Sequence, residues 1–419
     1  MRSHRTRFLS IAAVTAAAAI LAACSSGGNT STTSASNSKP IVIGASVSLT
    51  GDFSADGQAF QRGYNLWASD VNKAGGLMGR KVKLIFLDDK SDPTQGSTNV
   101  QQLISSDHVN LLFGPFSSLI TAPTSTVAAR YGYAMIEGAG GAPAVFNTPS
   151  NQAKHNVFDV SYPIVDQYDP LTNWIKSLPA GQRPKTAAYP IVDNPFTIPP
   201  EQRAQRQLES VGVKTVYSKV LPAELPNANA IADQVAATGA DAVLIGAVDV
   251  PTVAAFMKAF RQQHYNPKIL AATAGPDQGA AFLKAVGKAN ATGVMTANGW
   301  YGGYDNPQSK QMVQEYIAKY GGSPSDINSD VAEAYGVGQV AAQAVRATRG
   351  TDQAKIISYL HSGVTLNSVQ GPVQFNSLGM NMKPVVFVFQ WQNGNYAQVL
   401  PVGAPGSGQI LFPKPAWGG

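Results

Sequence analysis

The residue types that most often carry catalytic or metal chemistry are sparse in this chain. It has one cysteine, Cys24, and five histidines: His4, His108, His155, His264 and His361. The histidines show neither a His-Glu-x-x-His arrangement nor another paired spacing that would hold a metal on one face of a helix. A single cysteine cannot form an internal disulfide or a cysteine-based metal site. We therefore expect no metal and no catalytic centre built on these residues.

Glycine-rich and serine motifs of enzymes are also missing. No Gly-x-Ser-x-Gly elbow is present, which argues against a serine hydrolase of that type. The run Gly138-Ala139-Gly140-Gly141 suggests a nucleotide loop, but Pro143 occupies the place of the third glycine and no P-loop lysine follows. The pair Asp88-Asp89 ends an apolar run and is interpreted as a solvated strand end. The sequence therefore predicts a protein that is not an enzyme and has no cofactor.

Cys24 closes an N-terminal segment of the secretory type. Three arginines lie within the first seven residues, and residues 8–23 are largely apolar. The run Leu21-Ala22-Ala23-Cys24 resembles the lipobox of bacterial lipoproteins, in which the cysteine becomes lipidated and N-terminal. A spanning helix usually takes about 20 apolar residues, and this segment is shorter. We predict a signal peptide over residues 1–23 and a lipid on Cys24 that anchors the protein to the outer face of a bacterial cell membrane.

Residues 24–39 are polar and almost uncharged, so they cannot build a core and are expected to form a disordered tether. The formal net charge of the chain is +6, and three of its positive charges lie in the predicted signal peptide. Beyond that segment, lysine and arginine do not cluster. We therefore expect no nucleic-acid partner.

The rest of the chain alternates between short apolar runs and helical patterns. In the first block, Phe60, Tyr64, Trp67 and Val71 mark one face of a helix. Strands are expected over 41–45, 82–87, 110–113, 134–136 and 157–160, and in a second block over 185–191, 215–221, 241–245, 269–271 and 293–298. Strands separated by helices predict parallel sheets covered on both faces. The fold class is therefore α/β, with two doubly wound lobes.

The C-terminal third follows a different pattern. Two long helices are expected, one ending near Tyr320 and one over 329–349, followed by strands over 372–375 and 384–390. This part is too short for a third doubly wound domain. We expect it to complete the first two.

Several motifs in the first block resemble one family in their order and spacing. They are Gly44-Ala45-Ser46-Val47-Ser48-Leu49-Thr50-Gly51, then Gly57, then Asp70-Val71-Asn72 with Gly75-Gly76-Leu77-Met78-Gly79, then Asp88-Asp89 with Asp92-Pro93, and finally Gly114-Pro115-Phe116-Ser117-Ser118. The chain is similar to the leucine/isoleucine/valine-binding type of periplasmic substrate-binding protein, which serves ABC importers. More weakly, the resemblance extends to about Val402.

The resemblance implies a type I periplasmic-binding-protein fold, in which three crossovers join the lobes and the ligand is trapped between them. Lobe 1 is expected over 40–158 and 301–365, lobe 2 over 159–300 and 366–404, and a C-terminal tail over 405–419. In doubly wound sheets, ligands bind at the carboxyl ends of the strands. Hinge closure would then report occupancy to the permease.

Ser117 and Ser118 lie between a predicted strand and a predicted helix start. Free N–H groups and the helix dipole at such a place favour an anion, and a serine hydroxyl adds a donor. In the family, the corresponding serine holds a ligand carboxylate, and the resemblance puts that role on Ser118. The alternative is an ordinary helix N-cap.

Other positions depart from the amino-acid-binding pattern. Asp56 stands where the family has an aromatic residue before the glycine matching Gly57, and the aromatic expected near Val248 is missing. The loop that usually offers a threonine hydroxyl contains Ala139 and Gly141, which have none. The acidic residue that the family pairs with a ligand α-ammonium has no clear counterpart here, although Asp249 and Asp277 lie close to its place in the sequence. Without such a partner, a buried zwitterion is costly.

Two aromatic positions complete the predicted site. Phe196 falls where the family often carries a stacking tyrosine, and Trp300 follows the strand at 293–298. Both are alternatively core residues. The predicted ligand contacts are thus Ser117, Ser118, Ala139, Gly141, Phe196, Asp277 and Trp300.

The sequence therefore predicts a monomeric, lipid-anchored solute-binding protein outside the cytoplasm. Its expected partners are a small organic ligand (an amino acid, an amide or a small carboxylic acid), the permease and ATPase subunits of an ABC importer, and the membrane through Cys24. The alternative is a ligand sensor of the same fold that acts on a membrane signalling receptor.

Overall fold

A computed structural model describes residues 39–147, 150, 152–404 and 407–418. The predicted signal peptide, Cys24 and the predicted tether up to residue 38 lie outside the described residues. None of the helices within the described ranges combines the length and the apolar character that crossing a membrane requires. The described chain builds two α/β lobes, each around its own sheet.

The sheet of the first lobe is parallel, with the strand order β2-β1-β3-β4-β5. Its strands are β1 (Ile41–Val47), β2 (Val82–Asp88), β3 (Leu111–Phe113), β4 (Met135–Glu137) and β5 (Val157–Asp159). The inner strand β1, which lies between β2 and β3, is buried almost throughout, which explains its nearly continuous apolar sequence. Helices α1 (Ser54–Lys73), α2 (Pro93–Ser105), α3 (Ser118–Arg130) and α4 (Pro143–Phe146) connect these strands.

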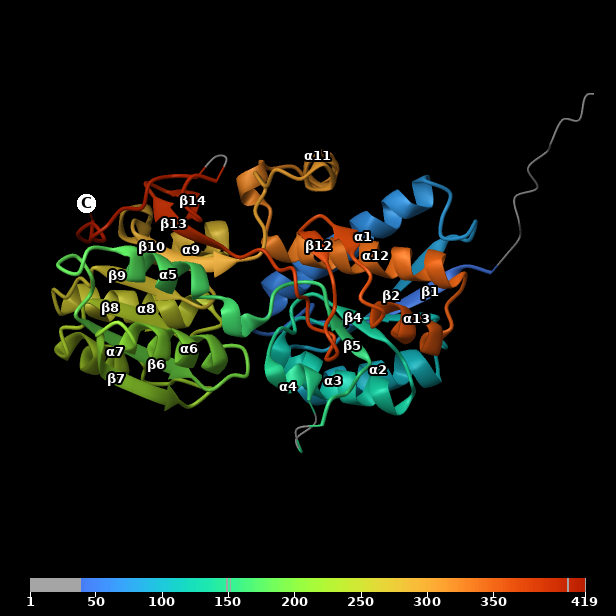
Figure 1. The fold of residues 1–419 in the computed structure, drawn as a ribbon, viewed down its shortest axis with the longest axis horizontal. Coiled ribbons are helices and arrows are strands. Elements are labelled where there is room, and N and C mark those ends of the chain that lie inside the picture. The colour runs from blue at the N-terminus through green and yellow to red at the C-terminus, as the bar shows by residue number, and fades with distance from the viewer. Residues whose placement is uncertain (1–38, 148–149, 151, 405–406, 419) are drawn as a thin grey trace, which may run out of the picture. The chain divides into compact units, whose positions relative to one another are not determined.

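Three later helices join the first lobe: α11 (Pro307–Tyr320), α12 (Ser329–Thr348) and α13 (Gln353–Leu360). The orange α12 lies against the blue α1, although the two are far apart in the sequence (Figure 1). Glycines allow this close packing. A Cβ atom on Gly338 would lie 2.2 Å from the ring of Trp67, and one on Gly63 would lie 2.3 Å from the carbonyl oxygen of Val331. The buried aromatic face predicted for α1 therefore packs against α12.

The second lobe has the strand order β14-β13-β10-β9-β8-β6-β7. Its parallel strands are β6 (Thr186–Val192), β7 (Lys214–Leu221), β8 (Ala242–Ile245), β9 (Ile269–Ala272) and β10 (Val294–Asn298), and its antiparallel strands are β13 (Phe387–Gln392) and β14 (Asn395–Leu400). Its helices are α5 (Asp169–Ser177), α6 (Ile198–Glu209), α7 (Ala228–Ala237), α8 (Val250–Gln262), α9 (Gly279–Val286) and α10 (Lys288–Ala291). Every strand predicted between residues 41 and 298 is present, whereas β14 was not predicted.

The chain passes between the lobes three times: after β5, after β10 and before β13. The third passage comes later than the predicted boundary at residue 365. The hairpin of β11 (Leu366–Ser368) and β12 (Gly371–Val373) belongs to the first lobe, because Val369 and Phe375 pack in its core. Residues 407–418 pack on the second lobe, where Trp417 Nε1 donates to the Tyr265 carbonyl oxygen at 2.7 Å.

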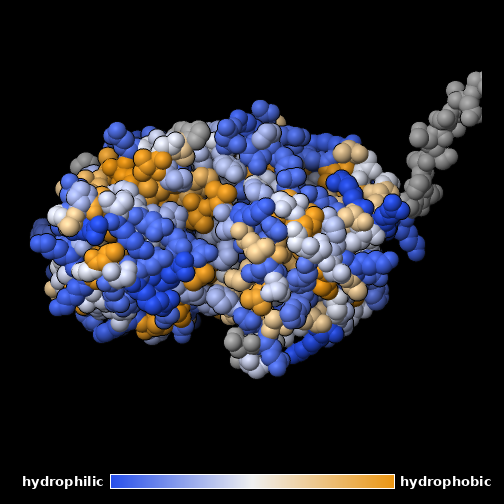
Figure 2. Space-filling view, viewed as in Figure 1, coloured by the Kyte–Doolittle hydropathy of each residue, from blue (hydrophilic) through white to orange (hydrophobic). Residues whose placement is uncertain are grey.

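The surface is chemically mixed. Figure 2 shows hydrophilic residues over most of the face in view, with smaller hydrophobic patches between them. Large apolar side chains that are more than one-third exposed include Met78, Val220 and Val402, which lie far apart in the sequence. Scattered exposed apolar residues are usual for a folded domain. The feature that distinguishes this molecule lies instead at the carboxyl ends of the two sheets.

Candidate ligand-binding site

A pocket lies where the carboxyl ends of strands from both lobes meet. Residues that follow β1, β3, β4 and β5 line it from the first lobe, and residues that follow β6, β8 and β9 line it from the second. The end of β10 also contributes, through Ala297 and Asn298. The pocket holds about 700 Å³ of empty space, a figure that includes its opening to solvent.

The first turn of α1 and the start of α3 form one wall. Phe53 and Phe116 line the pocket with ring centroids 5.7 Å apart in an edge-to-face arrangement. Asp56 follows on α1 and is only 5% exposed. A Cβ atom on Gly57 would lie 2.0 Å from the carbonyl oxygen of Ser48, so only glycine allows α1 to start this close to the end of β1. This close approach brings Asp56 to the pocket.

The loop after β4 forms a second part of the wall, and Glu137 shapes it. Glu137 Oε2 accepts hydrogen bonds from the backbone N–H groups of Ala139, at 3.0 Å, and Gly140. A Cβ atom on Gly141 would lie 2.6 Å from the Tyr162 carbonyl oxygen. A threonine at position 141 would therefore clash, which explains why the loop offers no hydroxyl there.

The segment between β5 and α5 carries Gln167 into the pocket. Gln167 Nε2 donates to the carbonyl oxygens of Thr273, at 2.8 Å, and Ala297, at 3.1 Å, so its position is fixed by the second-lobe strands β9 and β10. Its Oε1 atom is buried and has no hydrogen-bond partner among the described residues. An acceptor atom is thus available at the pocket wall.

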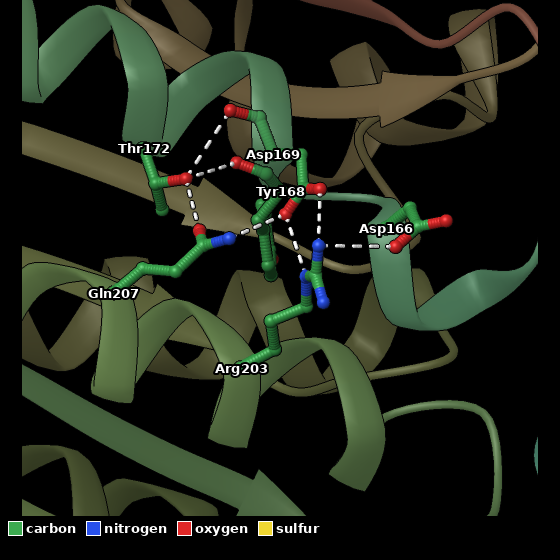
Figure 3. Close-up of polar contacts among 6 residues, drawn as sticks. All are labelled: Asp166, Tyr168, Asp169, Thr172, Arg203 and Gln207. Atoms are coloured by element: carbon green, nitrogen blue, oxygen red, sulfur yellow. Dashed lines mark hydrogen bonds and ion pairs between the residues drawn. The ribbon is translucent and has the colours of Figure 1, made fainter.

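A polar cluster stabilises the segment that carries Gln167. We call it the Arg203 cluster (Asp166, Asp169, Arg203 and Gln207). Figure 3 shows the side chains of Arg203 and Gln207, both from α6, pointing toward the start of α5. Arg203 donates to both oxygens of Asp169, at 2.8 and 2.6 Å, and lies 3.4 Å from Asp166. Gln207 Nε2 donates to Asp169 at 2.7 Å. The cluster therefore fixes both residues that flank the stretch containing Gln167.

Four acidic side chains line the pocket, and we call them the pocket carboxyls: Asp56, Asp277, Asp330 and Glu333. Asp56 accepts a hydrogen bond from Asn328 Nδ2 at 3.1 Å and another from Gln278 Nε2, on the other lobe, at 2.9 Å. Asp330 lies close enough to Asp56 for the two carboxyls to change each other's pKa. Asp330 and Glu333 both come from α12, one turn apart, which puts them on the same helix face.

Burial disfavours the ionised form of these carboxyls and so raises their pKa values. It raises the pKa of Asp56 to about 6 and that of Asp277 to about 7, and repulsion from Asp56 adds to the latter. The pKa values of Asp330 and Glu333 lie well above the ordinary range, first because of burial and then because of the neighbouring carboxylates. Behind the pocket, burial likewise raises the pKa of Asp159 to about 7. No lysine, arginine or histidine occurs among the described residues that line the pocket.

The structure brings five of the predicted contact residues to this pocket: Ser117, Ala139, Gly141, Phe196 and Asp277. Ser117 is the N-cap residue of α3, and its buried Oγ has no hydrogen-bond partner within the described ranges. Asp249, weighed beside Asp277 for an ammonium, instead caps α8 by accepting a hydrogen bond from the Thr252 N–H at 2.7 Å.

Two predicted contacts, Ser118 and Trp300, do not line the pocket. The Ser118 side chain is completely buried, and its Oγ lies 3.4 Å from the Ala139 carbonyl oxygen. Trp300 is 1% exposed within the first-lobe core, and its Nε1 donates to Ser309 Oγ at 2.8 Å. Asp89 also differs from its predicted solvated state, since it is fully buried and accepts hydrogen bonds from the hydroxyls of Ser46 and Ser48.

Sequence reasoning missed the role of three pocket carboxyls. Asp56 was noticed only as a departure from an aromatic position. Asp330 and Glu333 lie on a helix that has just one other charged residue, Arg346. When two acidic residues lie one turn apart on a largely apolar helix, the helix is expected to be buried and the two residues to belong to a functional site.

The family comparison agrees with this architecture. Residues 40–395 match the family model described as periplasmic binding protein. The chain belongs to that family. Its members are non-catalytic solute-binding proteins. Over 361 residues, the chain is 24% identical to Leu/Ile/Val-binding protein homolog 3 of Brucella melitensis, covering 84% of this chain and 92% of that protein. It is 25% identical to an amino acid binding protein of Pseudomonas aeruginosa over 372 residues, covering 86% and 92% of the two chains.

Solved structures share the fold of this family member. A leucine-binding protein from Thermotoga maritima superposes with a TM-score of 0.75 at 18% identity, covering 85% of this chain and 97% of that one. A solute-binding protein of an ABC transporter from R. palustris, in complex with 4-hydroxybenzoate, gives a TM-score of 0.73 at 18% identity, covering 91% and 99%. The predicted two-lobed α/β fold is thereby confirmed.

Proposed function

We propose that this protein captures a small organic solute outside the cytoplasm, in the pocket between its lobes, and delivers it to an ABC importer. The observation that carries the proposal is the pocket itself, which lies at strand ends from both sheets and is lined by both lobes. Family membership supports a binding role, and the relatives named for amino acids support a small solute.

The sequence suggests an amino acid, an amide or a small carboxylic acid as the solute, and the pocket carboxyls favour a small organic solute that carries an amino group. Ser117, Ala139, Gly141, Phe196 and Asp277 are proposed contacts, because all of them line the pocket. Three chain passages join the lobes, so closure about them would change the surface offered to a permease.

We further propose that a lipid on Cys24 retains the protein at the outer face of the cell membrane, with residues 24–39 as the tether. The support is the sequence around Cys24 alone. If Cys24→Ala still gave a processed, membrane-retained and palmitate-labelled product, the anchor would have to be abandoned. A receptor-coupled sensor of the same fold is the alternative function. Permease and ATPase genes beside this gene favour import, whereas a lone sensor kinase gene favours sensing.

The binding function is tested by a thermal-shift screen of the full-length protein against amino acids, amides, amines and small carboxylic acids. A ligand at 100 times its Kd adds about 2.7 kcal/mol to the free energy of unfolding, which is readily seen as a higher Tm. Recovery of the unaltered ligand after saturation is expected for a binding protein. A folded protein that none of these solutes stabilises would contradict the proposal.

A further inference from the structure

The ionisable side chains that line the pocket are acidic, and no described lining residue is basic. The four pocket carboxyls come from α1, from the loop after β9 and from α12, so both lobes contribute to them. The remaining described lining residues are neutral. Several carboxyls held together away from water ionise only at a cost unless a cation compensates them. The described residues that line this pocket supply no such cation.

Two buried polar atoms independently indicate a ligand here. Gln167 is 1% exposed, and its Nε2 is engaged by Thr273 and Ala297, so its unpartnered Oε1 remains available to accept a hydrogen bond. Ser117 is 7% exposed, and its Oγ also lacks a partner among the described residues. Buried polar atoms are normally satisfied. An N–H-bearing ligand in the pocket would satisfy both.

Four neighbouring carboxyls are more than one ammonium can neutralise. Besides burial, repulsion from Asp56, Glu333 and Asp277 raises the pKa of Asp330. Glu333 lies one helical turn further along α12 than Asp330, beside Ser161 Oγ at 3.4 Å, and repulsion from Asp159 is the largest charge effect on its pKa. A zwitterionic amino acid would add no net positive charge, and its carboxylate would face the carboxyls without a basic partner.

The apolar part of the lining fits the body of an organic cation. Phe53, Phe116 and Phe196 present rings to the pocket, and ring faces attract ammonium and guanidinium groups. A bare metal ion fits less well. Among the described residues, no group of three or more His, Cys, Asp or Glu side chains is placed to hold a metal ion.

We propose that the ligand is an organic cation with at least two protonated nitrogens, such as a diamine, a polyamine or a guanidinium compound. This inference rests on the proposed solute-binding function and specifies its ligand class. One nitrogen lies among Asp56, Asp277 and Asp330, and another lies at Glu333. The ligand supplies the positive charge that the pocket lacks.

This arrangement couples ligand binding to pH. The groups that face the pocket carboxyls from the neighbouring elements are Asp159, Glu137, Tyr64, Tyr162 and Tyr396, and none of them is basic. Burial holds the pKa of Asp56 near 6 and that of Asp277 near 7, so a cationic ligand must displace protons near neutral pH. Amine affinity should therefore rise with pH between 5.5 and 8, by about tenfold per pH unit for each proton released.

Calorimetry on the full-length protein at pH 7.5 tests the inference with four probes: putrescine, agmatine, butylamine and leucine. Butylamine is the matched control, because it has the carbon chain of putrescine but only one amine. We expect putrescine or agmatine to bind at least tenfold more tightly than butylamine and leucine. Asp330→Asn and Glu333→Gln should each weaken that binding tenfold or more. Asp305→Asn, at an exposed carboxylate paired with Lys310, should leave it unchanged.

The outcomes separate the two proposals. If leucine or a carboxylic acid binds and the diamines do not, the cationic ligand class is wrong and the solute-binding function stands. If no amine, amino acid, amide or carboxylic acid binds to the folded protein, the solute-binding function itself falls. If the diamines bind and both pocket variants bind them equally well, the placement at Asp330 and Glu333 is wrong. Should a variant fail to fold, the comparison of putrescine with butylamine on the unaltered protein still decides the ligand class.

Discussion

Two sets of acidic side chains in this protein have opposite surroundings. In the Arg203 cluster of the second lobe, burial alone would raise the pKa of Asp169, but hydrogen bonds from Arg203 and Gln207 hold it below the ordinary value. The pocket carboxyls and Asp159 behind them have no basic neighbour of this kind, and their pKa values are raised. Even Asp166, which lies farther from Arg203, keeps a raised pKa because burial outweighs the attraction.

The two regions differ in whether a basic side chain lies beside the carboxyls. The Arg203 cluster stabilises the start of α5 and thereby the stretch that carries Gln167 (Figure 3). Among the described residues that line the pocket, there is no arginine to stabilise the ionised carboxyls. These carboxyls therefore ionise only at a cost in stability, and a matching cationic ligand can offset that cost. The two regions therefore predict opposite responses to the same chemical change.

The largest expected effect is on the free energy of unfolding, and it concerns Asp159, behind the pocket carboxyls. Asp159 is 1% exposed, and its pKa is about 7 in the folded protein against about 4 in an unfolded chain. A raised pKa contributes stability below pH 4 that is lost as the pH rises through 7, a loss of roughly 4 kcal/mol by pH 8. Asp159→Asn should therefore raise the free energy of unfolding at pH 8 by about 2–4 kcal/mol and change it little at pH 4.

Urea denaturation of the unliganded protein at both pH values measures this difference. Asp305→Asn, at an exposed carboxylate, is the matched control, and it should change the free energy of unfolding by the same small amount at pH 4 and at pH 8. A stability gain for Asp159→Asn that is the same at pH 4 and pH 8 would mean that charge is not its cause.

A smaller effect of opposite sign is expected in the Arg203 cluster. Asp169→Asn removes the charge that Arg203 binds through two of its three guanidinium nitrogens. Because the Asp169 side chain is 26% exposed, solvent screens the pair, and we expect a loss of only about 1 kcal/mol at pH 7. A lowered pKa contributes stability above pH 4, so this loss should shrink as the pH falls below that value. Denaturation at pH 7 and pH 3 checks it, and stabilisation at pH 7 would contradict the contrast between the two regions.

The sequence predicted the fold well because its signals are local. Apolar runs such as residues 41–45 and the stripe from Phe60 to Val71 each report the burial of one element, and their alternation fixes a doubly wound lobe. The strand β14 was not predicted from the sequence because Asn395–Leu400 mixes polar and apolar residues at a sheet edge. The boundary at residue 365 was early because the short hairpin of β11 and β12 carries no signal for the lobe on which it packs.

The site was harder to predict because it depends on packing between distant segments. Asp56 and Asp330 are far apart in the sequence and meet only because Gly63 and Gly338 let α1 and α12 approach closely. A carboxyl on a helix usually indicates a solvated face, so Glu333 gave no sign of facing a pocket. The predicted pair Ser117 and Ser118 lay beside the right helix start, but which serine faces the pocket depends on the exact residue at which α3 begins.

The smallest predicted effect concerns this pair of serines and the neutral part of the pocket. Ser117 Oγ lines the pocket without a partner, whereas Ser118 Oγ is turned toward the Ala139 carbonyl oxygen. Ser117→Ala should therefore weaken the binding of putrescine about fivefold, through one lost neutral hydrogen bond of about 1 kcal/mol. Ser118→Ala is the matched control, with the same atoms removed one residue away, and should change the affinity less than twofold. Calorimetry on both variants decides between them, and a larger loss for Ser118→Ala would show that the second serine, rather than the first, contacts the ligand.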